Sequence, residues 1–139
     1  LFNVDPIRVP QKQPTKRHYK GPKKGELSCN PLGKNPGDVW KFTNIKNGHP
    51  EKIEGGHPCQ YPIELVEQFI LSMTKKNDIV LDPFGGVATT IVASLKHGRV
   101  GVSSEKDIDY FKTGKKRIKL FYQDKLPYKG RFEPTVVNH

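Results

Sequence analysis

The chain of 139 residues is only 34% hydrophobic and carries 12 prolines and 13 glycines, which predicts one small core within much irregular chain. A net charge of +10 at pH 7 favours a polyanionic partner. We expect no metal site, no membrane contact and a reduced, cytoplasmic setting, because the two cysteines lack zinc spacing, the histidines do not join them, and no signal peptide or membrane span is recognisable.

The first part of the chain is a basic segment with no acidic residue between positions 8 and 24. Prolines and glycines surround its charges, and His18 and Tyr19 are interleaved with them, so we expect an irregular structure. Such a segment suits contact with the phosphate backbone of DNA, since each neutralised phosphate releases counterions. The alternative is a solvated loop that only keeps the protein soluble. The predicted DNA contacts are Arg8, Lys12, Lys16, Arg17, Lys20, Lys23 and Lys24.

A turn-rich segment follows at residues 30–40. Its two prolines and two glycines predict a shaped loop, in which Lys34 and Asn35 can hydrogen-bond to bases or phosphates. Trp40, at the end of this loop, either anchors the segment in the core or stacks against a base. Residues 39–42 are compatible with a short strand.

The periodicity of a packed domain begins near residue 60. Pro62 suits the first position of a helix, because its missing N–H group would be unpaired there anyway. Residues 79–81 form a short apolar run, which is typical of a fully buried strand. The apolar face predicted for the helix consists of Leu65, Val66, Phe69, Ile70 and Met73.

Three further elements follow in the chain. A second helix is expected to end near Gly98, Val100 and Val102 indicate a second strand, and residues 108–118 indicate a third helix. Two strands make a poor sheet on their own, so an exposed strand edge is expected to need a partner. The basic side chains of the third helix fit a solvent-facing surface or a DNA contact equally well; they are Lys112, Lys115, Lys116, Arg117 and Lys119.

The turn between the first strand and the second helix has the features of a ligand-binding loop. Asp82 stands at the carboxyl end of the strand, where open α/β sheets bind their ligands. Gly85 and Gly86 allow close backbone approach, and Thr89 and Thr90 begin a helix whose free N–H groups face the same crevice. Taken alone, this pattern indicates either a cofactor loop or simple packing.

The residues of this turn resemble the Asp-Pro-Phe-x-Gly-x-Gly-Thr-Thr motif of amino-directed DNA methyltransferases, which transfer a methyl group from S-adenosylmethionine to an exocyclic nitrogen of adenine or cytosine. Residues 57–62 resemble the family's His-Pro-x-x-x-Pro segment. Glu105, followed by Tyr110, resembles the acidic residue that holds the cofactor ribose. The sequence departs from the family pattern in two places: Ala88 replaces the second motif glycine, and two serines at 103–104 replace the usual Gly-x before the glutamate.

The order of these motifs resembles the β class of the family, in which the catalytic half comes first and the cofactor loop last. The catalytic tetrapeptide of the family contains Pro-Pro, yet no two of the 12 prolines here are adjacent. The resemblance therefore implies only the C-terminal part, with a target-recognition-like basic segment (1–50), a cofactor-binding region (51–121) and a basic tail (122–139). The implied fold class is α/β, as part of a Rossmann-like methyltransferase sheet with an irregular basic N-terminal segment.

The resemblance also implies a function. The chain would bind S-adenosylmethionine and double-stranded DNA, while a polypeptide or segment with the catalytic half supplies the catalytic residues, so the chain alone would be inactive. The alternative is a non-catalytic DNA-binding or specificity module descended from such an enzyme. Cytosine-N4 and adenine-N6 both stay open as targets, and Glu51 and Lys52 either border the methionine moiety or form a surface ion pair. The implied cofactor contacts are His57, Pro58, Asp82, Pro83, Phe84, Gly85, Gly86, Thr89, Thr90 and Glu105.

Overall fold

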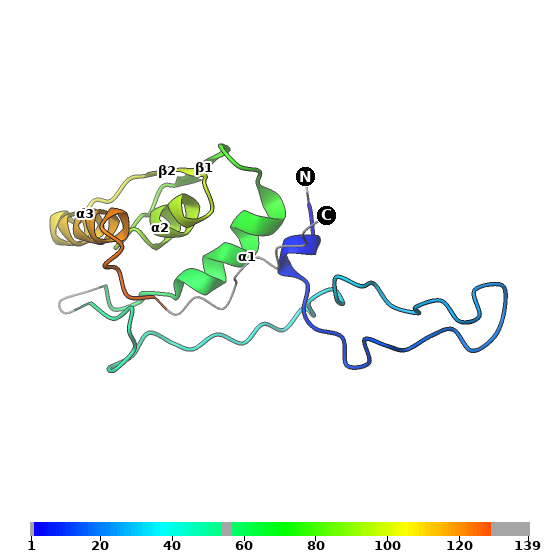
Figure 1. Cartoon of the computed structure of the whole chain (residues 1–139). Coiled ribbons are helices and arrows are strands. Elements are labelled where there is room, and N and C mark those ends of the chain that lie inside the picture. Colours follow the sequence, from blue (N-terminus) through cyan, green and yellow to red (C-terminus); the bar gives the residue numbers. More distant parts are fainter. Residues whose placement is uncertain (1, 54–56, 129–139) are drawn as a thin grey trace.

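The computed structural model describes residues 2–53 and 57–128 (Figure 1). A short 3-10 helix at the start, η1, is followed after a long irregular stretch by a small α/β unit. The part of the predicted basic tail beyond residue 128 lies outside the described residues. The elements in chain order are η1 (Asp5–Ile7), α1 (Ile63–Met73), β1 (Ile79–Asp82), α2 (Thr89–Lys96), β2 (Val100–Ser103) and α3 (Ile108–Tyr122).

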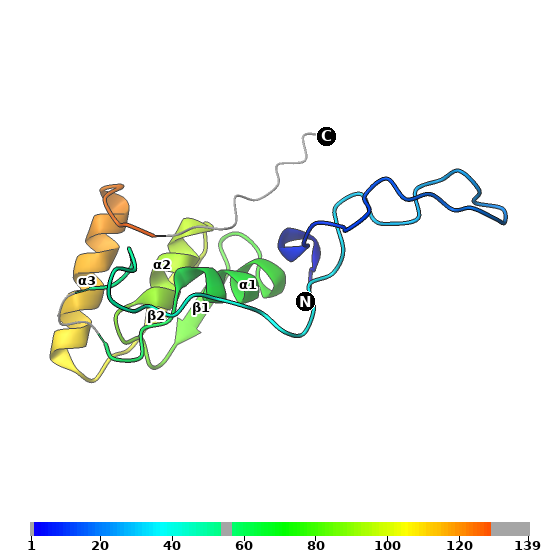
Figure 2. The ribbon, with the colours of Figure 1, turned by 90° about the horizontal axis from the view of Figure 1, so that it is seen from below.

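β1 and β2 form a parallel two-stranded sheet, connected through α2. All three α-helices lie on one side of this sheet, below the strands in Figure 1 and in front of them when the molecule is seen from below in Figure 2. Val80 packs against the core on that side. Its neighbour in register, Gly101, has no side chain because an added Cβ would lie 2.9 Å from Cδ1 of Ile91 in α2.

The prediction that residues 79–81 form a fully buried strand is wrong. Ile79 and Leu81 are 71% and 70% exposed, because they lie on the face of the sheet that no helix within residues 2–53 and 57–128 covers. Val100 and Val102 lie opposite them in register and are also exposed. Parallel sheets are normally covered on both faces. The four side chains Ile79, Leu81, Val100 and Val102 therefore form an open apolar surface, here named the open sheet face.

The core lies between α1 and α2. Its buried members are Ile63 and Ile70 of α1 with Val92 and Ala93 of α2, and side chains of α3 pack around them. Pro62 is the N-cap residue, one position before that predicted, which is within the usual uncertainty of helix ends. The predicted apolar face of α1 is buried only in part. Phe69 and Met73 are exposed, whereas Glu67, Gln68 and Leu71 of the same helix are buried.

A buried carboxylate joins α1 to the end of α2. Glu67 is fully buried, and its Oε1 lies 2.6 Å from Nζ of Lys96 and 3.0 Å from Nε2 of His97. Burial acts to raise the pKa of Glu67, but hydrogen bonds and charges from His97 and Lys96 outweigh burial and hold the pKa below its ordinary value of 4.5.

This cluster predicts a pH dependence of stability. Because the pKa of Glu67 is lower in the folded chain, its ionised form contributes stability above pH 4.5, and that contribution is lost as the pH falls through the folded value. Glu67→Gln should lower the free energy of unfolding at pH 7 by about 3 kcal/mol. Below pH 4.5 the free energy of unfolding should then fall less steeply with falling pH than it does in the unmutated chain. Urea unfolding at a series of pH values measures both effects. Asp109→Asn, at an exposed site, is the control. If the free energy of unfolding of Glu67→Gln falls with pH in parallel with that of the unmutated chain, Glu67 is not the group responsible.

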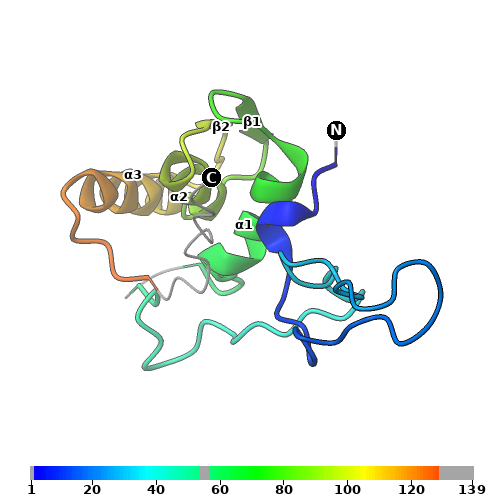
Figure 3. The same ribbon diagram turned by 45° about the vertical axis from the view of Figure 1, so that its right-hand side comes forward.

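The N-terminal stretch is irregular, as predicted, and residues 9–34 form an extended hairpin that stands away from the helices (Figure 3). Isolated antiparallel bridges join Val9 to Lys34 and Arg17 to Leu27. η1 attaches the base of the hairpin to the body, since Ile7 is buried and the N–H of Asn3 donates to the carbonyl of Ser72 in α1 at 2.7 Å. Residues 39–42 do not form the short strand that the sequence allowed. Among the described residues, none of the helices is long and apolar enough to cross a membrane.

Candidate functional site

The site begins at the carboxyl end of β1, where Asp82 joins both ends of the following turn. Its Oδ1 accepts a hydrogen bond from the backbone N–H of Phe84 at 3.0 Å. Its Oδ2 accepts from the hydroxyl of Thr90, in the first turn of α2, at 2.6 Å. One carboxylate therefore fixes the shape of residues 82–90, here named the cofactor loop, against the helix that follows.

Glu105, two residues after the end of β2, connects the second strand to the same loop. Its Oε2 accepts from the backbone N–H of Gly86 at 2.7 Å, and its Oε1 accepts from the N–H of Asp107 at 2.8 Å. Gly85 packs still closer, since a Cβ added there would lie 2.7 Å from Oγ of Ser103. These contacts bring the carboxyl ends of β1 and β2 together at one edge of the sheet.

His57 lies against the cofactor loop from the other side. Its ring meets the ring of Tyr110 edge to face, with centroids 4.6 Å apart, and a Cβ added at Gly86 would lie 3.9 Å from Cδ2 of His57. The His-Pro segment, the cofactor loop and the start of α3 thus converge, although Gly86 lies 29 positions after His57 in the sequence. Pro58, beside His57, is exposed.

The remaining predicted cofactor contacts differ in exposure. Phe84 is 86% exposed and Pro83 is exposed next to it, so the outer wall of the loop presents an uncovered ring. Thr89 is buried beneath the loop, and its hydroxyl faces α3 rather than the crevice. The predicted set therefore contains exposed side chains, such as Phe84 and Pro83, and side chains buried beneath the loop, such as Thr89.

Arg117 of α3 supports the loop from beneath and was missed by sequence reasoning. It is 2% exposed, and its Nη1 donates to the carbonyl of Val87 at 2.7 Å and to Oγ1 of Thr89 at 2.9 Å. Burial lowers the pKa of Arg117, and the negative charge of Glu51 counteracts that shift. Arg117 follows Gly114 by three positions, so the two residues lie on the same side of α3, and both are buried. This spacing is the sequence feature that could have indicated its burial.

Glu51 is the second residue whose role the sequence did not reveal. It is 2% exposed, so the predicted alternative of a surface ion pair with Lys52 is wrong. Its Oε2 accepts the backbone N–H of Ile63 at 3.0 Å and so satisfies a free donor at the start of α1. Because its charge also acts on Arg117, Glu51 connects the beginning of α1 to the support of the cofactor loop.

Tyr61 extends the hydrogen bonds of Asp82 towards α1. Its hydroxyl lies 3.3 Å from Oγ1 of Thr90, which itself donates to Asp82. Since a hydroxyl has one proton, the Thr90 proton goes to the carboxylate and the Tyr61 hydroxyl donates to Thr90. The chain from Tyr61 through Thr90 to Asp82 holds the side chain of Asp82 in one orientation.

The cofactor loop also contains a strained residue. Ala88, which immediately precedes α2, has φ of 62° and lies in the left-handed region that favours glycine. This is the position at which the resembled motif has its second glycine. The position at which the motif has glycine thus adopts a backbone conformation that favours glycine in this chain as well.

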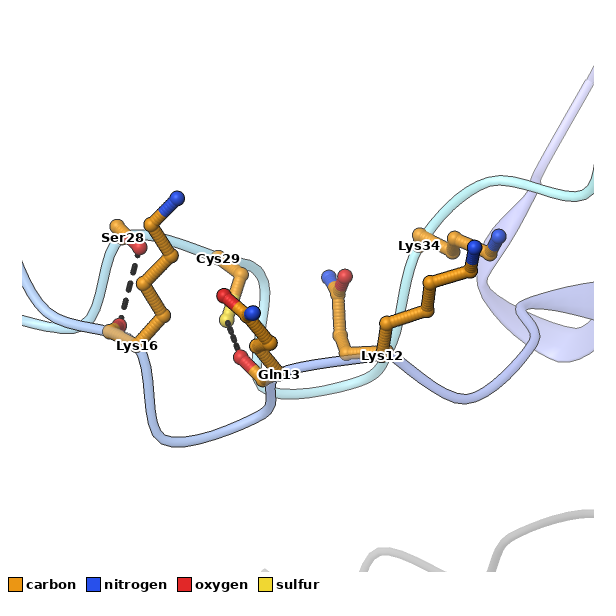
Figure 4. Close-up of a pocket in the computed structure, with 7 residues that line it drawn as sticks. Lys12, Gln13, Lys16, Ser28, Cys29 and Lys34 are labelled. Carbon is orange, nitrogen blue, oxygen red and sulfur yellow. Dashed lines mark hydrogen bonds between the residues drawn. The ribbon is translucent and has the colours of Figure 1, made fainter.

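The predicted DNA-binding residues fall into two groups. The lysines of the hairpin are exposed, and Lys12, Lys16 and Lys34 line one shallow cleft of about 460 Å³ together with Gln13 and Cys29 (Figure 4). Lys20, Lys23 and Lys24 lie towards its tip, and all three are exposed.

Arg8, Arg17 and Asn35 are instead used within the hairpin. Arg8 pairs with Asp5 at 2.7 Å and donates to Oδ1 of Asn35 at 2.7 Å, so both predicted contacts hold the base of the hairpin. Nη1 of Arg17 donates to the carbonyl of Gly25 at 2.6 Å across the hairpin. In the described part of the chain, no three His, Cys, Asp or Glu side chains are grouped as metal ligands.

Comparisons with known proteins agree with this arrangement. A family model described as "DNA methylase", for the N6 and N4 enzymes, matches residues 1–116. The type II methyltransferase M.BglII of Bacillus subtilis is 52% identical over 109 residues, which are 78% of this chain and 30% of M.BglII. The type II methyltransferase M.ScaI of Streptomyces caespitosus is 38% identical over 112 residues, 78% of this chain and 35% of M.ScaI.

The fold comparison gives the same result. The PvuII DNA methyltransferase, described as cytosine-N4-specific, superimposes with a TM-score of 0.51 and 27% identity over 66% of this chain and 38% of that one. The chain thus spans about a third of the length of these relatives. With a family model that covers most of its residues, the chain belongs to the N6/N4 DNA methylase family.

Proposed function

We propose that the chain is the cofactor-binding and DNA-contacting part of an S-adenosylmethionine-dependent, amino-directed DNA methyltransferase. The observation that carries this proposal is the cofactor loop. Asp82 and Glu105, at the ends of neighbouring parallel strands, hold opposite sides of one glycine-containing turn. Ligands of open α/β sheets bind at such strand ends.

The residues of the loop fit this cofactor. A carboxylate has about four acceptor positions, so Glu105 keeps capacity for ribose hydroxyl groups beyond its two bonds to N–H groups. Gly86 places no side chain over the backbone of the loop, and the exposed ring of Phe84 offers an apolar wall. S-adenosylmethionine supplies an electrophilic sulfonium methyl group when bound, so the task of these residues is to orient the donor.

The acceptor side of the reaction has to come from elsewhere, since the chain lacks adjacent prolines and with them the family's catalytic motif. We propose that a polypeptide with the catalytic half completes the sheet, and that this chain alone does not transfer methyl groups. The occupant of the open sheet face is then an α/β polypeptide with an apolar layer of its own. Two facts support this: parallel sheets are covered on both faces, and the chain spans only 30% of M.BglII.

A complementation assay tests this proposal. The part of M.BglII that the chain does not match would be produced separately, mixed with the chain, and assayed for transfer of tritiated methyl groups to duplex DNA. Transfer should require both polypeptides. Leu81→Lys should abolish complementation while leaving the unfolding transition of the isolated chain unchanged, because the side chain is 70% exposed. Met73→Lys, which is also at an exposed position but on α1, is the control and should leave complementation intact. Methyl transfer by the chain alone would refute the proposal that a second polypeptide supplies the catalytic half.

The hairpin is proposed to follow the phosphate backbone of DNA. If it does, replacing Lys12, Lys16 and Lys34 by Ala should reduce the slope of log affinity against log salt by up to about three units, at about 0.9 per lost phosphate contact. The expected loss is the same for all sequences, since phosphate contacts do not specify bases. Binding titrations with duplex DNA at several salt concentrations measure the slope.

A matched variant separates this contact from simple loss of charge. Lys112, Lys116 and Lys119 of α3 are exposed, and their replacement by Ala removes the same three charges. If the slope of log affinity against log salt is unchanged in this variant and reduced in the hairpin variant, the DNA contact is assigned to the hairpin. A reduced slope only in the α3 variant would move the DNA contact to α3.

The basic hairpin also supports a second candidate function, a DNA-binding or specificity module without catalysis. Its charges do not depend on the cofactor loop, because the hairpin stands apart from the α/β unit (Figure 2). Calorimetric titration with S-adenosylmethionine distinguishes the candidates. Binding of DNA without binding of the cofactor, in the presence of the complementing polypeptide, would favour the module.

A further inference from the structure

The base of the hairpin is where residues 9–34 join the rest of the molecule. The hairpin stands away from the helices, so contacts at its base set its position relative to the cofactor loop (Figure 3). The incoming leg begins at Val9 and the returning leg ends at Lys34, and each backbone N–H of this pair donates to the carbonyl of the other, at 3.0 and 2.9 Å. Isolated two-stranded hairpins are marginally stable in water, so one such bridge needs further support.

The guanidinium group of Arg8 supplies that support. Its Nε donates to Oδ1 of Asp5, in η1, at 2.7 Å. Its Nη1 donates to the carbonyl of Gly33 at 3.2 Å and to Oδ1 of Asn35 at 2.7 Å, on the returning side of the hairpin. The side chain is only 13% exposed. One planar group with several N–H donors therefore joins η1 to the end of the returning leg.

The two legs also approach each other closely at Gly33. Its φ of 110° lies in the region that favours glycine, and a Cβ added there would lie 2.5 Å from the carbonyl oxygen of Val9. A side chain at this position would push the legs apart. The glycine therefore keeps the returning leg within reach of the guanidinium group of Arg8.

η1 connects the hairpin base to α1, and α1 connects it to the cofactor loop. Ile7 of η1 is 1% exposed, and the N–H of Asn3 donates to the carbonyl of Ser72, near the C-terminal end of α1. Just before the other end of α1, the hydroxyl of Tyr61 is hydrogen-bonded to Thr90 of the cofactor loop. A single helix of 11 residues thus carries the hairpin base at one end and meets the cofactor loop at the other.

We infer that Arg8 is a positioning residue for methyl transfer, because it fixes the orientation of the hairpin relative to the cofactor loop without binding DNA itself. The inference deepens the proposed function and rests on it for the DNA and the cofactor. Phosphate contacts by the exposed lysines would set the register of the duplex on the hairpin, and Arg8 would relate that register to the bound methyl donor. Misplacing reacting atoms by about 1 Å can slow a reaction by about a hundredfold, so loss of this link should reduce the rate rather than the affinity.

Arg8→Leu should separate the rate of methyl transfer from binding. In the chain mixed with the complementing polypeptide, kcat should fall by about tenfold or more, while the Kd values for duplex DNA and for S-adenosylmethionine change by less than about twofold. Lys75→Leu removes one charge from an exposed position that has no assigned role, and it is the control. A loss of DNA affinity large enough to explain the slower transfer would overturn the inference.

Asn35→Ala tests the same contact from its other side without changing the charge. It removes the acceptor that lies 2.7 Å from Nη1 of Arg8, so kcat should fall here too. If both substitutions act through this hydrogen bond, the double variant should be slower than Arg8→Leu alone by less than about twofold. Independent effects that multiply in the double variant would refute the link between the two side chains.

The salt dependence of DNA binding distinguishes positioning from phosphate contact. Arg8→Leu should leave the slope of log affinity against log salt unchanged, because no phosphate contact is lost. Lys12→Leu, at an exposed position of the same leg, should reduce the slope by about 0.9. A reduction of about 0.9 in Arg8→Leu as well would show that Arg8 binds a phosphate, and the inference would be wrong.

A distance measurement tests the link without DNA or cofactor. Spin labels would be attached to Cys59, which is exposed, and to Lys23→Cys near the hairpin tip, in a chain whose other cysteine is removed by Cys29→Ser. Arg8→Leu should broaden the distribution of distances between the labels, whereas Lys75→Leu should not. An equally narrow distribution in Arg8→Leu would overturn the inference. Failure of the proposed function is seen separately, as no binding of S-adenosylmethionine by the complemented enzyme in calorimetric titration.

Discussion

Replacing Arg117 by Met should destabilise the chain by about 3 kcal/mol, because it removes buried hydrogen bonds that a charged group donates. The substitution deletes the bonds to the carbonyl of Val87 and the hydroxyl of Thr89. It also removes the favourable electrostatic interaction between Arg117 and Glu51. Urea unfolding followed by circular dichroism measures the free energy.

The adjacent Lys116 provides a matched control for this experiment. Lys116→Met removes the same charge from an exposed position of the same helix, and its effect should stay within about 0.5 kcal/mol. Arg117→Lys keeps the positive charge but not the planar guanidinium group with its several N–H donors, so its effect on the free energy of unfolding should be intermediate. Equal stability of the Met variants at 116 and 117 would show that Arg117 does not support the loop.

Replacing Glu105 by Ala should weaken S-adenosylmethionine binding by more than tenfold. Each charge-assisted hydrogen bond to a ribose hydroxyl contributes on the order of 1.5–3 kcal/mol. The variant also loses the bond that fixes Gly86, so the cofactor loop would be less well ordered before binding. Calorimetric titration with S-adenosylmethionine gives the affinity.

Two further variants separate these causes. Glu105→Gln keeps an acceptor for a hydroxyl but removes the charge, so it should bind more tightly than Glu105→Ala and less tightly than the unmutated chain. Asp109→Ala, four residues later and exposed, should leave affinity unchanged. Unchanged affinity in Glu105→Ala would remove Glu105 from the cofactor site.

The sequence predicted the local elements around the cofactor loop well, because these depend on neighbouring residues. The strand before Asp82, the helix start at Thr89 and the second strand before Glu105 follow from apolar runs and small residues within a few positions. The convergence of His57 with the loop followed only from the family resemblance, since no local pattern relates positions so far apart.

The predictions that failed depended on contacts made across the fold. An apolar run at residues 79–81 indicates a strand, but whether both faces are covered depends on how many helices surround the sheet. Arg117 was grouped with four surface lysines because charge alone does not show which side of a helix is buried. Glu51 looked like a surface residue because the donor that it satisfies, the N–H of Ile63, lies 12 positions away.

The open sheet face has a consequence for the behaviour of the chain in solution. Exposed apolar patches and free strand edges attract other copies of the same chain, while a net charge of +10 keeps those copies apart by repulsion. Added salt shortens the range of that repulsion but leaves the attraction between apolar surfaces in place. If the hairpin binds DNA as proposed, the salt that weakens this binding should also promote self-association of the chain through the open sheet face.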